Sequence, residues 1–334
     1  MIGARTEDGH RMNPNELEYR TLLREDLDAA RALMVSACRD IPHPIREPVE
    51  ELIVGGGKRL RPALVLLSSR LYGADHQEAL LTAASVELLH TATLIHDDLI
   101  DRAAVRRGVE TINARWAPTA SVLAGDIVFA LAAKLIAQTN NTPLVQRFAE
   151  ALETICTGEL QQMFGRNGNL PSVDTYYRRI FAKTASLFSL CMESGPILTG
   201  APEQESEQAS QFGRLLGEAF QITDDVLDLL GAPQQLGKPI GSDLQQGLVT
   251  LPVLLYTQTV GDGALVQHAL HHPEDAGAMS ALLDELRIRG AGELAMAHAR
   301  ERAAAAAKLL HSYPDSPHRR ALEEITRFAV ARAY

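Results

Sequence analysis

Two acidic motifs of the form D-D-x-x-D, Asp97–Asp101 and Asp224–Asp228, constrain this 334-residue chain more than any other feature. Each lies in an otherwise apolar stretch, LLHTATLIHDDLID and EAFQITDDVLDLL. If both stretches are helical, the first and last Asp of each motif share one face, about a turn apart. Carboxylates placed together in this way repel each other and are costly to bury without a cation. The fold must therefore supply each motif with a cation.

The ligand chemistry of the motifs favours magnesium. Carboxylate oxygens suit Mg²⁺, which keeps several waters and is usually completed by substrate phosphates. One D-D-x-x-D motif is weak evidence, because it occurs by chance on many solvated helices. Two such motifs, both embedded in apolar sequence, predict a magnesium site that one core assembles from both.

The amino-acid composition and the placement of Gly and Pro residues predict an all-α fold. Apolar residues make up 46% of the chain and aromatic residues only 5%, and Ala and Leu dominate, which favours helices. Short breaks rich in Gly or Pro, such as 41–48, 73–76 and 140–143, separate pieces that lack the Val/Ile alternation of strands. We expect residues 1–15 to form a mobile tail and residues 16–334 to form a single domain of roughly a dozen helices.

Charge and cysteine content indicate a cytoplasmic protein that does not bind nucleic acid. The formal net charge is −10, which disfavours nonspecific nucleic-acid binding. Cys38, Cys156 and Cys191 lie far apart without ligand-like spacing, as expected of reduced thiols. The polar N-terminus is not expected to act as a signal peptide. Asp126 and Lys134 interrupt the longest apolar stretch, so we expect no transmembrane span.

Cationic residues near the motifs stand in places suited to phosphate groups. The segment GGGKRLRP (55–62) puts Lys58 and Arg61 at the expected start of a helix, where free N–H groups also favour an anion. It is not a Walker A loop, because Arg59 occupies the place of the required Ser or Thr. A solvated basic turn is an equally good interpretation of this segment alone. Further cations near the motifs are Arg106, Arg107, Lys183 and Lys238.

Three other polar residues lie close to the motifs. His90 precedes Asp97 by two helical turns and shares its face, so it is either a ligand contact or a core histidine. His96 is off that face and is expected to be structural. Gln221, one turn before Asp224, either contacts a diphosphate or lies on the helix surface.

These segments resemble the trans-polyprenyl diphosphate synthases. The matching segments, in the family's order, are GGGKRLRP (55–62), ELLHTATLIHDDLIDRAAVRRG (87–108), VLAGD (122–126), AKTASLF (182–188), FQITDDVLD (220–228) and GKPIGSDLQQGLVTLP (237–252). The resemblance implies an isoprenoid-synthase helical bundle around a deep central cavity, and a homodimer. It implies that isopentenyl diphosphate is condensed head-to-tail onto an allylic diphosphate, with Mg²⁺ as cofactor.

The resemblance also implies a role for each matching residue. The metal ligands would be Asp97, Asp98 and Asp101 on one wall and Asp224, Asp225 and Asp228 on the other. The allylic diphosphate would be held by Arg106, Lys183, Thr184, Gln221 and Lys238. Isopentenyl diphosphate would be held by Lys58, Arg61, His90 and Arg107. The residues expected to be catalytic are Asp97, Asp101, Lys183 and Asp224. One residue departs from the pattern: the family often has Lys where this chain has Leu248, so one expected cation is missing.

Product length is expected to depend on the room behind the first motif. In short-chain members an aromatic ring commonly stands four or five residues before the first Asp, where this chain has Thr93 and Ala92. Both residues are small, so we expect an open cavity floor and a product longer than C20. Such a product is expected to leave slowly, with at most a transient membrane contact. Elongation of the product could also be stopped by residues deeper in the cavity, namely Val86, Leu89, Phe129 and Met163.

Several alternatives remain. A short-chain (C15–C20) synthase differs only in the cavity floor. A metal-dependent phosphohydrolase could use the pair His96-Asp97, but that function leaves the second acidic motif unexplained. A non-catalytic synthase subunit would be expected to lack one or both motifs. A terpene cyclase shares one motif but has no need of Lys58, Arg61 and Arg107 for a second diphosphate.

Overall fold

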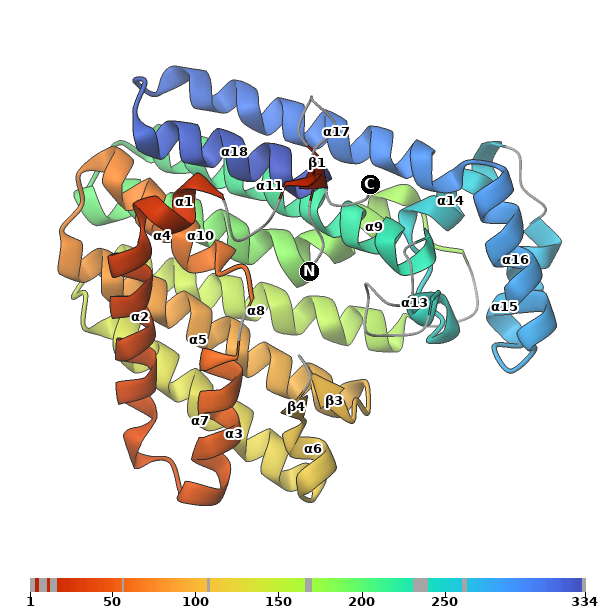
Figure 1. The fold of residues 1–334 in the computed structure, drawn as a ribbon, viewed down its shortest axis with the longest axis horizontal. Coiled ribbons are helices and arrows are strands. Elements are labelled where there is room, and N and C mark those ends of the chain that lie inside the picture. Colours follow the sequence, from red (N-terminus) through yellow and green to blue (C-terminus); the bar gives the residue numbers. More distant parts are fainter. Residues whose placement is uncertain are drawn as a thin grey trace.

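The computed structural model describes residues 17–55, 57–106, 109–165, 170–230, 240–259 and 263–331, together with the strand residues 4–5 and 11–12. These residues are almost entirely helical, as the composition predicts. The long helices run roughly alongside one another across the molecule (Figure 1).

The helices of the first half carry the first acidic motif. They are α1 (Glu18–Leu22), α2 (Arg24–Ala37), the 3₁₀ turn η1 (Cys38–Asp40), α3 (His43–Val54), α4 (Leu60–Tyr72), α5 (His76–Ile100), α6 (Ile112–Arg115), α7 (Pro118–Ala137) and α8 (Thr142–Phe164). Two antiparallel strand pairs accompany them, β1 (Ala4–Arg5) with β2 (Arg11–Met12) and β3 (Val105–Arg106) with β4 (Val109–Glu110). The first pair lies within the expected tail, whose other residues are outside the described ones.

The helices of the second half carry the second acidic motif. They are α9 (Val173–Ile180), the π-helical turn η2 (Phe181–Ala185), α10 (Ser186–Thr199), α11 (Glu203–Leu230), α13 (Ser242–Gln245), α14 (Leu251–Thr259), α15 (Gly263–His271), α16 (Ala276–Ile288), α17 (Ala291–Leu309), the 3₁₀ turn η3 (Leu310–Ser312) and α18 (Pro317–Ala331).

Helix α5 is the central helix and ends in the first acidic motif. Its N-terminus is capped by Asp75, whose Oδ1 accepts hydrogen bonds from the backbone N–H groups of Gln77 and Glu78 at 2.9 and 3.0 Å. It packs against α2, α4, α7 and α10. By length and composition α5 and α7 could each cross a membrane, but 78% of the apolar window of α5 is buried inside the protein. Burial in the core therefore accounts for the apolar character of α5.

Helix α11 joins the two apolar clusters of the core. Its residues Phe212 and Leu216 belong to the cluster built around α4, α5 and α10. Ile222 and Val226, on the same helix, belong to the cluster that includes α14, α16 and α17. Because both clusters pack against α11, they fix the position of the second acidic motif on this helix.

Two glycines let neighbouring helices approach the π-helical turn η2 closely. A Cβ atom on Gly158 of α8 would lie 2.3 Å from Cβ of Ala182, and one on Gly217 of α11 would lie 2.6 Å from Cα of Ala185. Any side chain at either position would collide with the turn. Helices α8 and α11 therefore hold η2 from two sides, which fixes the direction of Lys183 between them.

One expected break is shorter than predicted, because only residues 41–42 separate η1 from α3. Helix α3 starts at His43 and continues through Pro48, within the segment 41–48 that the sequence pattern predicts as a break. Pro44 fits its first turn, where no N–H donor is needed. Pro48 is buried in the interior of the helix. Packing against the core therefore outweighs the helix-breaking tendency of this proline.

Candidate active site

The first acidic motif ends α5, and its three carboxylates have different surroundings. Asp97 is partly exposed, Asp98 is only 3% exposed, and Asp101, the C-cap of the helix, is exposed. Asp97 and Asp101 thus reach the accessible side one turn apart, as their spacing predicts. The C-terminal end of a helix carries partial negative charge, so carboxylates there are destabilising unless a cation neutralises them.

The chain itself neutralises Asp98. Its Oδ1 forms an ion pair with Nε of Arg106, which strand β3 places close to the end of α5. Burial raises the pKa of Asp98, whereas the hydrogen bond and charge of Arg106 lower it. The structure therefore assigns Arg106, predicted as a diphosphate ligand, a contact with the motif itself. Asp98, predicted as a metal ligand, faces inward and has at least one oxygen occupied.

Charges from α8 and η2 meet at Asp97. Burial raises the pKa of Asp97 to about 6, the charge of Lys183 lowers it, and the charges of Glu159 and Asp101 raise it. Lys183 is exposed on the π-helical turn, and Glu159 lies on α8. A carboxylate that burial disfavours in this way is stabilised when a cation binds beside it. The site is thus built to gain from a metal ion.

The second acidic motif divides its carboxylates in the same way. Asp224 is partly exposed, whereas Asp225 and Asp228 are 4% and 2% exposed. The oxygens of Asp228 accept hydrogen bonds from Oγ of Ser242 at 2.7 Å and from the backbone N–H of Asp243 at 3.2 Å. Asp228 thus ties the end of α11 to α13. Sequence reasoning, which predicts all three as metal ligands, gives no sign of this difference.

Both oxygens of Asp225 accept hydrogen bonds from the protein. Oδ2 accepts from the hydroxyl of Tyr176 at 2.7 Å, and Oδ1 accepts from Nε2 of Gln221 at 2.8 Å. Burial raises the pKa of Asp225 to about 7, the charge of Asp243 adds to this, and the two hydrogen bonds and the charge of Arg179 oppose it. Tyr176 is fully buried and is a site residue that the sequence analysis missed.

A chain of hydrogen bonds connects this carboxyl group to the π-helical turn. Oγ1 of Thr184 donates to Oε1 of Gln221 at 2.6 Å, and Gln221 donates onward to Asp225. The predicted residues Thr184 and Gln221 are therefore brought together, and they link η2 to α11. π-Turns recur at functional sites because they redirect side chains within a continuous helix. Here the turn directs Lys183 toward the first motif while Thr184 faces the second.

Lys58, just before α4, and Arg61, in the first turn of α4, lie against aromatic rings. Nζ of Lys58 lies 4.8 Å from the ring centre of Phe328, and the guanidinium of Arg61 lies 5.1 Å from that of Phe188. Burial lowers the pKa of Arg61, and the charges of Glu87, Cys191 and Asp224 oppose this. Nε of Arg61 is buried and has no hydrogen-bond partner among the described residues. A buried donor without a partner is costly, so this group is suited to an anionic ligand.

Arg59, between these two cations, has a structural role. Its backbone is left-handed, with φ of 50°, and its Nη1 lies 2.9 Å from Oε1 of Glu87. Glu87 is 5% exposed on α5, so the ion pair fixes the start of α4 to the central helix. Nothing in the sequence distinguishes Arg59 from Lys58 and Arg61, because the difference depends on one left-handed residue.

The two candidate histidines, His90 and His96, differ in their surroundings. His90 is partly exposed on the same side of α5 as Asp97, as predicted. His96 packs on Phe129 with ring centres 5.5 Å apart, and its Nε2 lies 3.2 Å from the carbonyl oxygen of Val122. That environment supports the structural role expected of His96. It leaves no support for a phosphohydrolase built on His96 and Asp97 as a pair.

The residues expected to control product length differ in exposure. Ala92 is fully buried, whereas Thr93 is partly exposed, and its Oγ1 donates to the carbonyl oxygen of His90 at 2.7 Å. Thr93 therefore lies on the accessible side of α5 together with Asp97. Leu248, the departure from the family pattern, is partly exposed between α13 and α14. Two predicted diphosphate ligands, Arg107 and Lys238, lie outside the described residues.

The carboxylates fit a magnesium site that substrate completes. Among the described residues, no group of three or more His, Cys, Asp and Glu side chains is arranged to hold a metal ion. The accessible oxygen donors come instead from Asp97 and Asp101 at the end of α5 and from Asp224 on α11. Mg²⁺ is commonly bound by one or two carboxylates, waters and phosphate oxygens, so this arrangement fits it.

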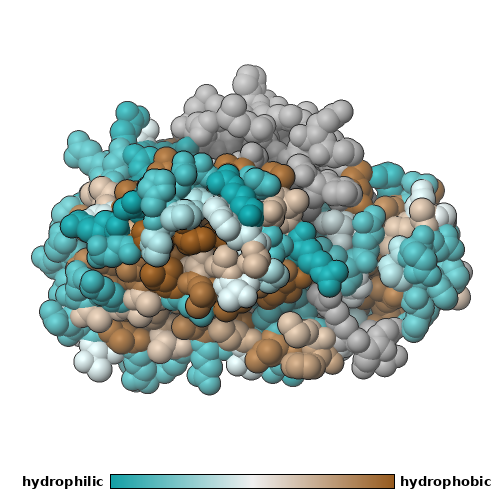
Figure 2. Space-filling view, turned by 90° about the horizontal axis from the view of Figure 1, so that it is seen from below, coloured by the Kyte–Doolittle hydropathy of each residue, from teal (hydrophilic) through white to brown (hydrophobic). Residues whose placement is uncertain are grey.

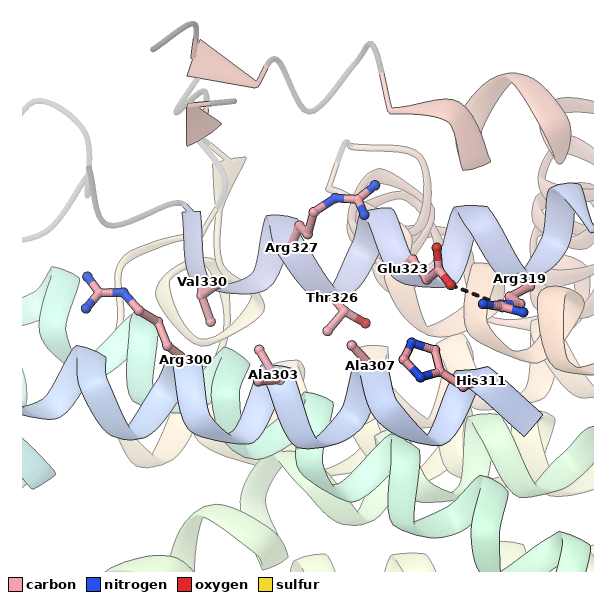
Figure 3. A pocket seen from close by; sticks show the side chains of 10 residues that line it. Arg300, Ala303, Ala307, His311, Arg319, Glu323, Thr326, Arg327 and Val330 are labelled. Carbon is pink, nitrogen blue, oxygen red and sulfur yellow. Dashed lines mark hydrogen bonds and ion pairs between the residues drawn. The ribbon is translucent and has the colours of Figure 1, made fainter. Parts of the chain in front are cut away.

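A cavity of about 520 Å³ lies elsewhere, between α17 and α18 (Figure 3). Ala303 and Ala307 of α17 point into it from one side, and Thr326 and Val330 of α18 point into it from the other. None of the predicted site residues lines this cavity. It is therefore separate from the acidic walls.

Comparisons with known proteins agree with this geometry. The family model described as polyprenyl synthetase matches residues 42–286. Octaprenyl diphosphate synthase of Haemophilus influenzae is 35% identical over 85% of this chain and 87% of its own length. The short chain isoprenyl diphosphate synthase of Methanothermobacter thermautotrophicus is 31% identical over 95% of this chain and 100% of its own. The crystal structure of a polyprenyl synthase from Caulobacter crescentus, complexed with calcium and isoprenyl diphosphate, superposes with a TM-score of 0.89 at 35% identity, covering 95% of this chain and 98% of that chain.

The raised pKa of Asp97 predicts a pH-dependent gain in stability for Asp97→Asn. Folding raises the pKa of this carboxyl from 3.8 to about 6, so its charged form costs stability above pH 6 and the cost disappears toward pH 4. In EDTA, Asp97→Asn should therefore melt roughly 2–5 °C above wild type at pH 8. The gain should shrink as the pH falls to 4.5. Glu153→Gln, an exposed change on α8, should shift neither melt. Equal shifts at both pH values, or none at pH 8, would contradict this account.

Proposed function

Because the chain belongs to the polyprenyl synthetase family and is a prenyltransferase, we propose that its two acidic walls hold the diphosphate of an allylic substrate while isopentenyl diphosphate is added. One observation carries the proposal: each wall keeps accessible carboxylates and couples them to a cation. Asp97 interacts with Lys183, and Asp224 interacts with Arg61. Such alternation of charge suits a metal–diphosphate complex placed between α5 and α11.

The carboxylates of each motif have separate tasks. Asp97, Asp101 and Asp224 are the residues that would hold Mg²⁺, because they are the accessible members. Asp98, Asp225 and Asp228 orient the motifs through Arg106, Tyr176 and Ser242. When bound, Mg²⁺ supplies positive charge to the departing diphosphate.

Two sets of cations separate the two diphosphates. Lys183, beside Asp97, holds the allylic diphosphate together with Lys238. Lys58 and Arg61, at the start of α4, hold isopentenyl diphosphate. The buried Nε of Arg61 provides a donor that is costly to leave unsatisfied, and a phosphate oxygen would satisfy it. His90 and Arg107 complete this second set.

The residue types explain the reaction. Breaking the allylic C–O bond develops negative charge on the diphosphate and leaves a carbocation, so the barrier depends on fixed positive charge around the leaving group. Lys183 provides such charge at the first wall. The double bond of isopentenyl diphosphate attacks the cation, and loss of a proton ends the cycle. The buried apolar residues of α5 keep water away from the cation.

Condensation itself is the direct test. Purified protein with labelled isopentenyl diphosphate and a C15 allylic diphosphate should give labelled polyprenyl diphosphate, EDTA should abolish it, and Mg²⁺ should restore it. Asp97→Asn, which should fold more stably than wild type at pH 8, should lose turnover about 10²-fold or more. Glu153→Gln serves as the matched active control. Full turnover in metal-free buffer, or release of phosphate from a nucleotide in place of condensation, would refute the function.

The product is longer than C20. The two positions next to the first motif are Ala92 and Thr93, and neither carries a ring. The octaprenyl synthase, at 35% identity, is also more similar to this chain than the short-chain synthase at 31%. Each added five-carbon unit buried in the cavity contributes up to roughly 4 kcal/mol, at about 0.8 kcal/mol per carbon. The product therefore leaves slowly and contacts a membrane only transiently.

Thr93→Phe should shorten the product. Thr93 lies on the accessible side of α5, so a ring there stands in the path of the growing chain, and products should stop at C15–C20. Thr93→Val, which matches threonine in volume, should leave the product distribution unchanged. Ala92→Phe should instead lower the melting temperature, because Ala92 is fully buried. Thin-layer chromatography of dephosphorylated products measures the product lengths. A wild-type product of C15–C20, or an unchanged distribution in Thr93→Phe, would refute the open floor.

The protein acts as a homodimer in the cytoplasm. Only 39% of the apolar window of α7 is buried, and Val122 and Leu123 on it are 42% and 62% exposed. The face shown in Figure 2 carries apolar patches among hydrophilic ones. An exposed apolar helix face marks a protein interface. The unpaired state of Cys38, Cys156 and Cys191 suits a reducing compartment.

Sedimentation equilibrium tests the dimer. Wild type should sediment at about twice the 36.3 kDa of the chain, and Leu123→Asp should shift it toward the monomer. The exposed change Glu153→Gln should leave the mass unaltered. A monomeric wild type at micromolar concentration would refute this assembly.

A further inference from the structure

Arg179 of α9 is a cation that no predicted role includes. Its Nη2 donates a hydrogen bond to the carbonyl oxygen of Val249 at 2.6 Å. Its guanidinium lies 5.4 Å from the ring centre of Tyr176, whose hydroxyl donates to Asp225. The residue therefore connects α9 to the segment before α14, and its ring partner Tyr176 connects it to the second acidic motif.

Arg179 is one side chain away from that motif, because its guanidinium lies over the ring of Tyr176 and the Tyr176 hydroxyl donates to Asp225. Four residues later in the same continuous helical run, Lys183 is exposed on the π-helical turn and is the cation assigned to the first motif. The run α9–η2 thus presents one cation to each acidic wall. A diphosphate held between the walls needs positive charge on both sides.

The guanidinium still has capacity for a ligand. One nitrogen, Nη2, is bonded to Val249, and the structure gives the other two nitrogens no hydrogen-bond partner among the described residues. The side chain is partly exposed. A guanidinium presents five N–H donors in a planar fork that matches phosphate oxygens. The hydrogen bond to the carbonyl oxygen of Val249 holds the guanidinium in one orientation, and it uses only one of the five N–H donors.

The segment that contains Leu248 has no cation of its own, since residues 240–250 include neither Lys nor Arg. The segment between α13 and α14 carries leucine at the position where the family resemblance leads us to expect a charge. Arg179 is bonded to the very next residue, Val249. A cation from α9 thereby reaches the segment that itself lacks one.

We propose that Arg179 is a diphosphate-binding residue of the allylic site and supplies the positive charge that Leu248 omits. This assignment rests on the proposed function, since it requires an allylic diphosphate between the two acidic motifs. It makes Arg179 specific for one of the two substrates.

Steady-state kinetics of Arg179→Gln tests the assignment. The KM for the allylic diphosphate should rise about tenfold or more, as expected for loss of a charge-assisted hydrogen bond, while the KM for isopentenyl diphosphate changes less than about twofold. Arg178→Gln is the matched control, because Arg178 is exposed on the same helix and, among the described residues, donates to Thr175 alone, at 3.3 Å. It should leave both KM values unchanged. An unchanged allylic KM in Arg179→Gln would overturn the proposal.

Moving the positive charge from Arg179 to position 248 tests whether Arg179 binds the diphosphate or only holds the backbone at Val249. In the Arg179→Gln background, Leu248→Lys should restore most of the allylic affinity without restoring the bond to Val249. If Arg179 serves only to hold Val249, this double variant should recover nothing, and the melting temperature should fall in both variants. Failure of this rescue in a folded protein would overturn the proposal.

A single variant covers the case in which Arg179→Gln does not fold. Leu248→Lys in the wild-type chain keeps Arg179 and its bond, so the allylic KM should stay within about threefold of wild type because the charge is already present. A fall of tenfold or more in the KM for the allylic diphosphate would show that the wild-type site lacks a cation, and it would overturn the proposal. Absence of any condensation by wild type would instead refute the proposed function itself.

Discussion

The cost of gathering carboxylates between two helices is the constraint on which the rest of this structure depends. Six aspartates stand in two motifs, three of them almost fully buried, in mainly apolar stretches of α5 and α11. Burial is the largest cause that raises the pKa of Asp97, Asp98 and Asp225, and neighbouring carboxylates add to it. The protein tolerates them by pairing the inward-facing members with its own donors, Arg106, Tyr176 and Ser242. The accessible members can also be reached by an external cation. The burial that raises the pKa of Asp97 therefore also favours binding of a metal ion beside it.

The π-helical turn makes this arrangement possible. It interrupts an otherwise regular run from α9 to α10 and directs Lys183 to one wall and Thr184 to the other. The missing side chains of Gly158 and Gly217 allow α8 and α11 to hold the turn at van der Waals distance. A loop could carry the same residues, but a turn packed between two helices keeps its cation in place. Such preorganisation matters because a fixed charge needs no costly reorganisation when negative charge develops on the leaving group.

The sequence predicted the parts of the site that follow from helical periodicity. The all-α fold and the pairing of Asp97 with Asp101 on one side of α5 depend only on local pattern, and the structure confirms them. The separate tasks of Asp225 and Asp228 could not be predicted, because they depend on Tyr176 and Ser242, which no spacing rule links to the motif. The role of Arg59 depends on one left-handed backbone residue, and that of Arg179 on a carbonyl group seventy positions away. The predicted break at 41–48 is limited to residues 41–42, because burial of Pro48 outweighs its local preference. Side-chain roles decided by long-range partners thus remain beyond local sequence patterns, even where the chemistry of the site is apparent.

The division of each motif into metal-facing and fold-facing carboxylates is the central claim, and it is tested most directly by binding of Mg²⁺ and inorganic pyrophosphate to variants of the second motif. Calorimetry should show that Asp224→Asn weakens Mg²⁺-dependent pyrophosphate binding about tenfold or more while the melting temperature in EDTA stays within a degree or two of wild type. Asp225→Asn should do the reverse, shifting the melting temperature because the hydrogen bonds to Tyr176 and Gln221 change, with a smaller effect on binding. Equal losses of binding in the two variants, at unchanged stability, would contradict the claim.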